Sequence, residues 1–313
     1  MSERQEFVWA EKYRPRKIND CILPASMKKI FKGFLRKGEI NSMMLAGSPG
    51  TGKTTVAKAL CEELGCDYIV INASKESGID TLRTKIQSFC STVSLAGGPK
   101  VVILDEFDRA SPAFQDAFRT FVEDFISNAR FILTCNQKNR IIDPIHSRCP
   151  PIEFNIEKSE RPKMAQAFME RLKKILDAEG VTYNEKVVAQ LLLKHFPDYR
   201  RVINELQRYS VDGDIDEGLL AKVQNVDIKA LFNTLKEKDF KGMRKWVADN
   251  SDADPNNIFR QIYDYASEYI EPSTIPNAIL LLADYQYKSA FCRDQEINLA
   301  ACLTELMATL KFK

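Results

Sequence analysis

Residues 47–54 carry a pattern that suits a phosphate group. They read GSPGTGKT and match G-x-x-x-x-G-K-[ST]. Glycines let the backbone fold so that its N–H groups point at a β-phosphate, and the start of a helix favours negative charge at the same place. Lys53 can reach the β- and γ-phosphates, and the Thr54 hydroxyl can ligate Mg²⁺. The pattern predicts a nucleoside triphosphate site, with a structural glycine turn and an exposed lysine as the alternative.

Polar side chains also follow two apolar runs further along the chain. Asp105 and Glu106 come directly after VVIL at 101–104, and Asn136 follows FILTC at 131–135. The carboxyl ends of strands are where open α/β sheets bind ligands. Asp105 would hold Mg²⁺ through water, Glu106 would orient and deprotonate an attacking water, and Asn136 would position that water or touch the γ-phosphate. The alternative is that all three simply end strands and meet solvent.

These groups need a sheet to position them, and the first 155 or so residues have the pattern of one. Short, continuous apolar runs, as expected of buried parallel strands, lie at 43–46, 68–71, 101–104 and 131–135. Helical candidates alternate with these runs at 54–64, 79–90 and 112–125. The alternation predicts an α/β domain with a parallel sheet.

After about residue 155 the strand pattern stops. Amphipathic helices are expected at 163–176, 186–194 and 200–209, the last with Asp198 as a possible N-cap, and a turn at 210–216. From about residue 225 the chain is again helical, with breaks at 252–255 and 272–276. The pattern predicts an α/β domain followed by two helical domains.

The composition sets outer limits on the function. The 313 residues are 44% hydrophobic and 28% charged, which excludes a disordered tail, a collagen-like fibre and a small disulfide scaffold. Lys+Arg total 45 and Asp+Glu 43, a balance that neither requires nor excludes nucleic acid. Eight cysteines without a C-x-x-C pair argue against zinc, and two histidines argue against a His-rich metal site or a Ser-His-Asp triad. The N-terminus has no apolar signal core and no apolar run could cross a bilayer, so a cytoplasmic location is expected.

Several further signatures resemble those of AAA+ ATPases, and of sliding-clamp-loader subunits in particular. Residues 9–15 (WAEKYRP) resemble the W-x-x-K-Y-R-P opening of those subunits, and INAS at 71–74 with GID at 78–80 resembles their second-strand segment. Residues 147–149 match their S-R-C motif. CILP at 21–24 and FPDYR at 196–200 are most similar to the large subunit of clamp loaders from phages of the T-even type.

This resemblance implies a fold and three domains. The fold class is α/β: an AAA+ P-loop domain with a parallel sheet over 1–155, then a small helical lid domain over 156–226, then an all-helical collar domain over 227–313 that joins subunits in a ring. The strand order would be that of AAA+ proteins, and the lid would fold over the nucleotide.

The resemblance also implies roles for particular residues. The cofactor-binding set would be Ala10, Glu11, Lys12, Tyr13, Ile22, Gly50, Thr51, Gly52, Lys53, Thr54, Thr55 and Arg200. Arg200 would be a second sensor that contacts the γ-phosphate, and Arg148 an arginine finger that enters the site of a neighbouring subunit. Gln115 would couple DNA to the catalytic carboxylate. Many clamp loaders have Gly-Asp-x-Arg at the second sensor, but Phe and Pro precede Asp198 here, so Arg201 remains an alternative to Arg200.

Contacts with macromolecules are implied near the helix at 79–90. Arg83, with Lys75 and Lys85, would follow the phosphate backbone of primer–template DNA, unless they form a solvated basic face. Clamp contacts would come from Phe89, Val93 and Leu95, although an apolar residue on a helix more often belongs to a core. Arg109 and Arg119 suit either DNA contact or plain surface charge.

Together these features predict a DNA-stimulated, Mg²⁺-dependent ATPase subunit of a viral DNA replication clamp loader. ATP binding would open and hold a sliding clamp, and primer–template DNA would trigger hydrolysis and release of the clamp. The expected partners are identical subunits, at least one other loader subunit, the clamp and primed DNA, with no membrane. The expected cofactors are ATP and Mg²⁺.

The same residues leave other functions open or argue against them. An AAA+ helicase loader or protein remodeller is the main alternative to the clamp loader. A DExD helicase would continue into a second α/β domain, and a small-molecule kinase has no need of Glu106 beside Asp105. A scaffold that never hydrolyses ATP would not need Lys53, Glu106 and Arg148 together.

Overall fold

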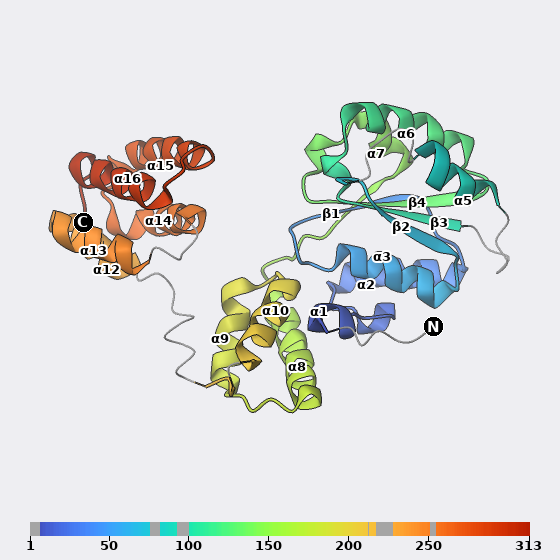
Figure 1. The fold of residues 1–313 in the computed structure, drawn as a ribbon, viewed down its shortest axis with the longest axis horizontal. Helices are drawn as coiled ribbons and strands as arrows, with labels where there is room; N and C mark the ends of the chain where they lie inside the picture. Colours follow the sequence, from blue (N-terminus) through green and yellow to red (C-terminus); the bar gives the residue numbers. More distant parts are fainter. Residues whose placement is uncertain (1–6, 76–81, 93–99, 212, 217–227, 251–254) are drawn as a thin grey trace. The chain divides into compact units, whose positions relative to one another are not determined.

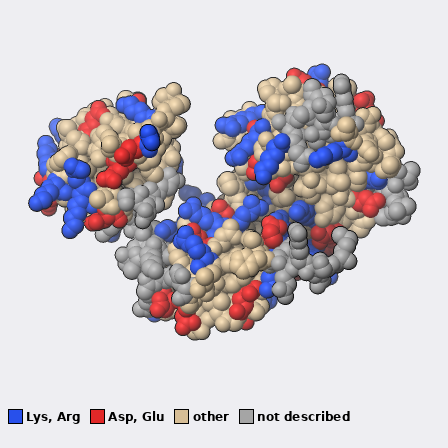
Figure 2. All heavy atoms as spheres, viewed as in Figure 1, with Lys and Arg blue, Asp and Glu red and all other residues tan. Residues whose placement is uncertain are grey.

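The computed structural model describes residues 7–75, 82–92, 100–211, 213–216, 228–250 and 255–313. The chain divides into two compact units, Met1–Leu219 and Leu220–Lys313. Figure 1 shows a mixed α/β first unit and a helical second unit. Lys and Arg side chains are interspersed with Asp and Glu on both units in the view of Figure 2, in keeping with totals of 45 and 43.

The first unit contains a five-stranded parallel sheet in the order β2-β3-β4-β1-β5. Its strands are β1 (Met43–Ala46), β2 (Tyr68–Asn72), β3 (Lys100–Asp105), β4 (Ala129–Cys135) and β5 (Pro151–Glu153). Met44 lies opposite Leu133, and Leu133 lies opposite Leu104. This order makes β3, β4 and β1 central neighbours, although they are distant in the sequence.

Helices cover both faces of the sheet (Figure 1). The elements that precede α8 in this unit are α1 (Trp9–Lys12), η1 (Ile18–Asp20), α2 (Ala25–Lys37), α3 (Lys53–Leu64), η2 (Leu82–Ile86), α5 (Gln87–Ser91), η3 (Phe107–Arg109), α6 (Pro112–Asp124), η4 (Lys138–Arg140) and α7 (Asp143–Arg148). Helices α2 and α3 lie on one face of the sheet, and α5, α6 and α7 lie on the other.

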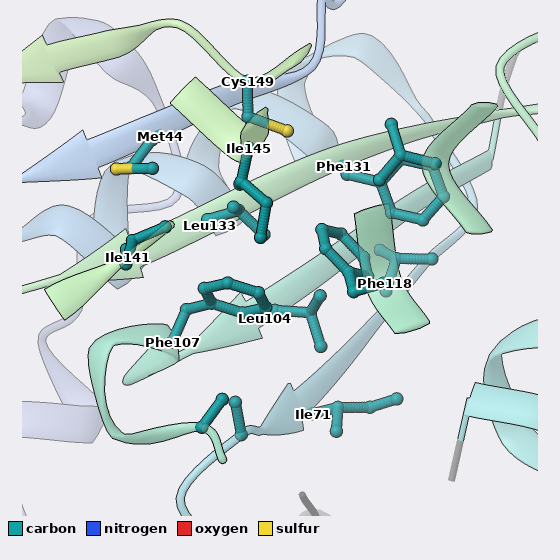
Figure 3. Close-up of a cluster of buried hydrophobic side chains, with 14 of the residues drawn as sticks. Met44, Ile71, Leu104, Phe107, Phe118, Phe131, Leu133, Ile141, Ile145 and Cys149 are labelled. Atoms are coloured by element: carbon teal, nitrogen blue, oxygen red, sulfur yellow. The ribbon is translucent and has the colours of Figure 1, made fainter. Parts of the chain in front are cut away.

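Alternate side chains of the central strands enter two different cores. Leu104 belongs to the core beneath α6, where the Phe118 and Phe131 rings meet edge to face at 5.4 Å (Figure 3). Ile103 faces the opposite core, with Phe31 of α2 and Leu60 of α3. A strand buried on both faces gives a continuous apolar run, and this is why the strands could be predicted.

Helices α8 (Arg161–Glu179), α9 (Glu185–His195) and α10 (Tyr199–Ser210) follow the sheet, and we call them the lid helices. Neighbouring lid helices pack on each other, and α10 also packs against α1. The Asp198 carboxylate caps α10 by accepting a hydrogen bond from the Arg201 N–H at 3.0 Å. The predicted cap and all three predicted helices are confirmed, each helix being longer than expected.

The second unit is helical in its described part. Its helices are α12 (Ile228–Lys236), α13 (Phe240–Asp249), α14 (Pro255–Tyr269), α15 (Ile275–Ser289) and α16 (Gln295–Thr309). They enclose one core that includes Phe232, Ile262 and Leu303. The predicted break at 272–276 coincides with the start of α15, whereas most of the break at 252–255 lies outside the described residues. Among the described residues, no helix is long and apolar enough to span a membrane.

The fold class is as predicted, and the differences are local. The sequence does not predict α2, β5 or the short helix α1 within residues 9–15. Strand β5 has three residues with no fully buried position, too few for a recognisable period. Helix α2 has no side-chain cap at its start, so the usual N-terminal signal is missing.

Candidate active site

The loop between β1 and α3 is built around glycines. Gly50 and Gly52 have φ angles of 72° and 91°, in the left-handed region that a β-carbon disfavours. Helix α3 then begins at Lys53, so the N–H groups of its first turn open toward the loop. The loop therefore has the shape and dipole of an anion-binding cradle.

The Lys53 ammonium group is bonded to main-chain carbonyls of this loop. It donates to the carbonyls of Gly47 at 2.7 Å and Ser48 at 2.8 Å, and to Oδ1 of Asn136 at 2.9 Å. Burial lowers the pKa of Lys53, and the nearby carboxylates of Asp105 and Asp108 oppose that shift. Lys53 and Asn136, predicted separately from two motifs, are thus brought into direct contact.

A second polar group joins α3 to β3 and β4. The Thr54 hydroxyl donates to Asp105 Oδ1 at 2.7 Å, and the Thr134 hydroxyl donates to the same oxygen. Hydroxyl and carboxylate oxygens are the ligands that Mg²⁺ prefers, so the pair predicted for metal fits that ion. Sequence reasoning missed Thr134, although it is the one hydrogen-bonding residue type inside the apolar run at 131–135.

Glu106 lies at the edge of the same group. It has a φ of 55°, and its backbone N–H donates to the Thr134 hydroxyl at 3.2 Å. Its carboxylate is 3.5 Å from the Arg109 guanidinium, and the two side chains are 37% and 59% exposed. The acid predicted as the general base therefore remains accessible to water. Arg109, for which DNA contact and surface charge were both open, lies beside it.

A cavity of about 190 Å³ connects these groups. It is lined by most of the predicted nucleotide residues, namely Ala10, Tyr13, Ile22, Gly50, Thr51, Gly52, Lys53, Thr54, Thr55, Asp105, Glu106, Asn136 and Arg200. The predictions Glu11 and Lys12 are not among its lining residues. In one helical turn only residues three or four apart share a face, so Ala10 and Tyr13 face the cavity while Glu11 and Lys12 point elsewhere.

The lid helices close one side of the cavity. The Tyr199 N–H donates to the carbonyl of Gly50 at 3.1 Å, and its ring lies 4.5 Å from that of Phe168. Arg200 lines the cavity and Arg201 does not, so the placement favours Arg200 as the second sensor. Arg171 of α8 also lines the cavity but was not predicted, because nothing in the sequence distinguishes it from other basic residues of that helix.

Arg148 also lies away from the cavity. Arg148, at the end of α7, donates from Nε to Glu123 Oε1 at 2.9 Å and from Nη1 to the Pro144 carbonyl at 2.6 Å. It is not among the described residues that line the cavity. Its role as an arginine finger for another subunit stays a prediction.

Gln115 is buried between the segments that follow β3 and β4. Its Nε2 donates to the carbonyls of Ala110 at 3.3 Å and Arg140 at 3.2 Å, and its Oε1 accepts from the Ile142 N–H at 3.0 Å. Because Gln115 is hydrogen-bonded to both segments, a displacement of one segment would strain the bonds to the other. This arrangement suits the coupling role that was predicted for it.

The residues predicted to touch DNA or a clamp are described only in part. Lys75, Lys85 and Arg119 are exposed, but the side chain of Arg83 and residues Val93 and Leu95 lie outside the described part of the chain. Phe89 is half-buried and packs against the core, with the Lys100 ammonium group 4.6 Å from the centre of its ring. Their contacts remain predictions.

Two regions of the chain match models of known protein families. Residues 43–157 match the family described as "ATPase family associated with various cellular activities (AAA)", and residues 160–221 match "Sliding-clamp-loader large subunit, AAA+ ATPase lid domain". The sliding-clamp-loader large subunit of Enterobacteria phage T4 is 36% identical over 99% of this chain and 98% of its own. That of Escherichia phage RB69 is 40% identical over 79% of this chain and 80% of its own.

A solved structure supports the fold alone. The Holliday junction branch migration motor RuvB of Thermotoga maritima aligns with a TM-score of 0.54 at 21% identity, over 74% of this chain and 80% of that one. At this identity the likeness extends to the AAA+ architecture and no further.

Proposed function

Because the chain belongs to the family of sliding-clamp-loader large subunits, we propose that it uses ATP to open a sliding clamp and releases that clamp on primed DNA. The chain is an ATPase subunit of the AAA+ class. The observation that carries the proposal is the convergence of the glycine loop, Asp105 and Asn136 at the ends of β1, β3 and β4 around one cavity.

The residues that line this cavity have different roles in the proposed hydrolysis of ATP. The loop N–H groups and Lys53 bind the β- and γ-phosphates, exchanging the carbonyl partners of Lys53 for phosphate oxygens. Thr54 and Asp105 would hold Mg²⁺, and the ion would supply positive charge beside the phosphate oxygens. Glu106 takes the proton of the attacking water, and Asn136 orients that water. Arg200 contacts the γ-phosphate from the lid helices.

Arg148 completes the site of an adjacent subunit. In its own chain it is bound to Glu123 and Pro144, and the cavity contains no contribution from it among the described residues. A planar guanidinium matches the charge that develops on the transferred phosphoryl group, which an ammonium would match less well. Hydrolysis therefore depends on assembly.

We extend the proposal to the contacts with macromolecules that the family resemblance implies. Lys75, Arg83 and Lys85 contact primer–template DNA, Gln115 relays that contact to Glu106, and Phe89, Val93 and Leu95 contact the clamp. The assembly contains identical copies, at least one other loader subunit, the clamp and primed DNA, and it acts in the cytoplasm of the host cell. Residues 1–155 would form the ATPase domain and 156–226 the lid, which contain most of the matched regions 43–157 and 160–221, and 227–313 would form the collar.

The test is ATP turnover by the full-length chain with its partner subunits, measured with and without primed DNA and clamp. We expect strong stimulation when both are present. Arg148→Ala should abolish turnover and leave ATP binding intact, since the guanidinium acts on another subunit. Mixing Arg148→Ala with Glu106→Gln chains should restore part of the activity.

Two outcomes would contradict the proposal in different ways. Turnover that responds to neither DNA nor clamp would exclude the clamp loader and favour a helicase loader or protein remodeller. Mixed variants that never regain activity would show that Arg148 does not act between subunits.

A further inference from the structure

The segment that carries the WAEKYRP motif lines the cavity and also contacts the lid helices. Ala10 and Tyr13 face the cavity, but Trp9 and Lys12 do not, and their chemistry is not used by the site described above. The Trp9 ring is buried, and α1 packs against α10 (Figure 1). Two residues of the lid helices hold them instead: Gln207 binds the main chain of Trp9, and Glu179 binds the Lys12 side chain.

Gln207 of α10 fixes the backbone at one end of the segment. Its Oε1 accepts from the Trp9 N–H at 2.9 Å, and its Nε2 donates to the Phe7 carbonyl at 2.6 Å. One amide thus provides an acceptor and a donor to main-chain groups two residues apart, as a neighbouring strand would. This contact holds the path of the main chain, whatever side chains it carries.

Glu179, the last residue of α8, fixes the other end. Its Oε1 accepts from the Lys12 ammonium group at 2.8 Å and from the Tyr13 hydroxyl at 2.6 Å. These hydrogen bonds, that from Lys12 first, lower the pKa of Glu179, so the group is ionised at neutral pH. Its side chain is only 19% exposed, which limits competition from water.

Beyond Tyr13 the same segment is attached to α3. Arg14 Nη1 donates to the Thr55 hydroxyl at 3.2 Å, and the Ile18 N–H donates to Glu63 at 2.8 Å. The segment therefore runs from the lid helices, along the cavity, to the helix that begins with Lys53. If the lid helices moved away from α3, either these bonds would break or the cavity wall would move with the lid.

We propose that Glu179 and Gln207 form a latch, which ties the part of the cavity wall formed by Ala10 and Tyr13 to the lid helices. Because of this latch, binding of the nucleotide base against that wall helps to close the lid over the triphosphate. The inference rests on the proposed function, since it takes the base of ATP to lie against Ala10 and Tyr13. A ligand can shift a conformational equilibrium only through its different affinities for the two states, and the latch provides that difference. Glu179 is a positioning residue, because it touches Tyr13 rather than the nucleotide.

The test compares ATP with inorganic tripolyphosphate, which carries the phosphates without a base. Both are titrated into the full-length chain with Mg²⁺ by calorimetry. Glu179→Ala should weaken ATP binding about 10-fold, since it removes two charge-assisted hydrogen bonds, and should leave tripolyphosphate binding unchanged. Glu179→Gln keeps the acceptor oxygen and should retain most of the affinity.

Tyr13→Phe provides an independent variant because it removes only one oxygen and keeps the ring against the cavity. We expect a loss of about 3-fold for ATP, and no further loss when it is combined with Glu179→Ala. Glu170→Ala is the matched control, an exposed acid on the same helix, and should change neither titration.

Unchanged ATP affinity in both Glu179→Ala and Tyr13→Phe would overturn the latch. Equal weakening of ATP and tripolyphosphate would also overturn it, because the effect would then lie in the phosphate loop or in the fold. A wild-type chain that binds no ATP would overturn the proposed function as well. Failure of the latch alone leaves wild-type binding intact, so the two failures are distinguishable.

Discussion

Gly50→Ala is the substitution whose effect can be worked out most directly from the structure. A β-carbon at this position would lie 1.7 Å from Asp198 Oδ1 and 3.0 Å from the Asp198 α-carbon, so Asp198 has to move. The backbone would also keep a φ of 72°, which costs a side chain about 1 kcal/mol. The loop and the start of α10 cannot both stay in place.

Two contacts are lost when Asp198 moves. Its cap on the Arg201 N–H contributes about 1 kcal/mol to α10, and the hydrogen bond from Tyr199 to Gly50 contributes a net amount of about 1 kcal/mol. With the backbone strain, the closed lid loses about 2 to 3 kcal/mol. At 1.36 kcal/mol per tenfold change, this is about a 30- to 150-fold loss of ATP affinity if the lid opens to relieve the clash.

Calorimetric titration measures the loss of ATP affinity, and the melting temperature without nucleotide measures the loss of fold stability. Together they separate an effect on binding from an effect on the fold. Gly33→Ala is the matched control, since a β-carbon there meets nothing within 4 Å, and in a helix it should leave ATP binding unchanged. Adding Asp198→Gly to Gly50→Ala should recover part of the affinity, because glycine is a tolerable N-cap and removes the clashing carboxylate. If Gly50→Ala changes neither affinity nor melting temperature, the lid does not contact the loop as described.

Three further predictions follow from the site. Thr134→Val should lower kcat about 10-fold or more, because Asp105 and the Glu106 N–H lose their shared hydroxyl partner, and Thr134→Ser should retain activity in the same turnover assay. Arg171→Met should raise the KM for ATP with little change in kcat, and an equal loss of kcat would contradict a role in binding. Burial, with Arg201 and Lys194 nearby, lowers the pKa of His195 below its usual 6.5. The unfolded chain therefore takes up that proton first, so stability should fall as the pH drops below about 6.5, and urea unfolding of His195→Gln should show a weaker loss in that range.

The residues that line the cavity could largely be predicted because most of them lie in short contiguous segments. The glycine loop with Lys53 and Thr54 is one contiguous motif, and Asp105, Glu106 and Asn136 each follow an apolar run directly. A local pattern is enough for such groups, because each side chain is positioned by the strand or helix that adjoins it.

Other features escaped prediction because their partners are distant in sequence. Glu179 and Gln207 lie on helices with many other polar residues, and only their contacts with the N-terminal segment, to Tyr13 and Trp9, distinguish them. Arg171 is likewise one basic residue of several on α8 until the cavity forms beside it. Lys12 was assigned to the pocket wall, but the rotation of one helical turn directs it to Glu179.

The sequence by itself predicted which residues would bind and cleave a triphosphate, since residue type and short spacing decide what a loop or strand end can do. Only the tertiary structure decided that β3, β4 and β1 are adjacent, so that Asp105, Asn136 and Lys53 meet, and that the lid helices hold the N-terminal segment beside them. The physical reason is that strand order and helix packing depend on the burial of apolar faces far apart in the chain, which no local spacing records.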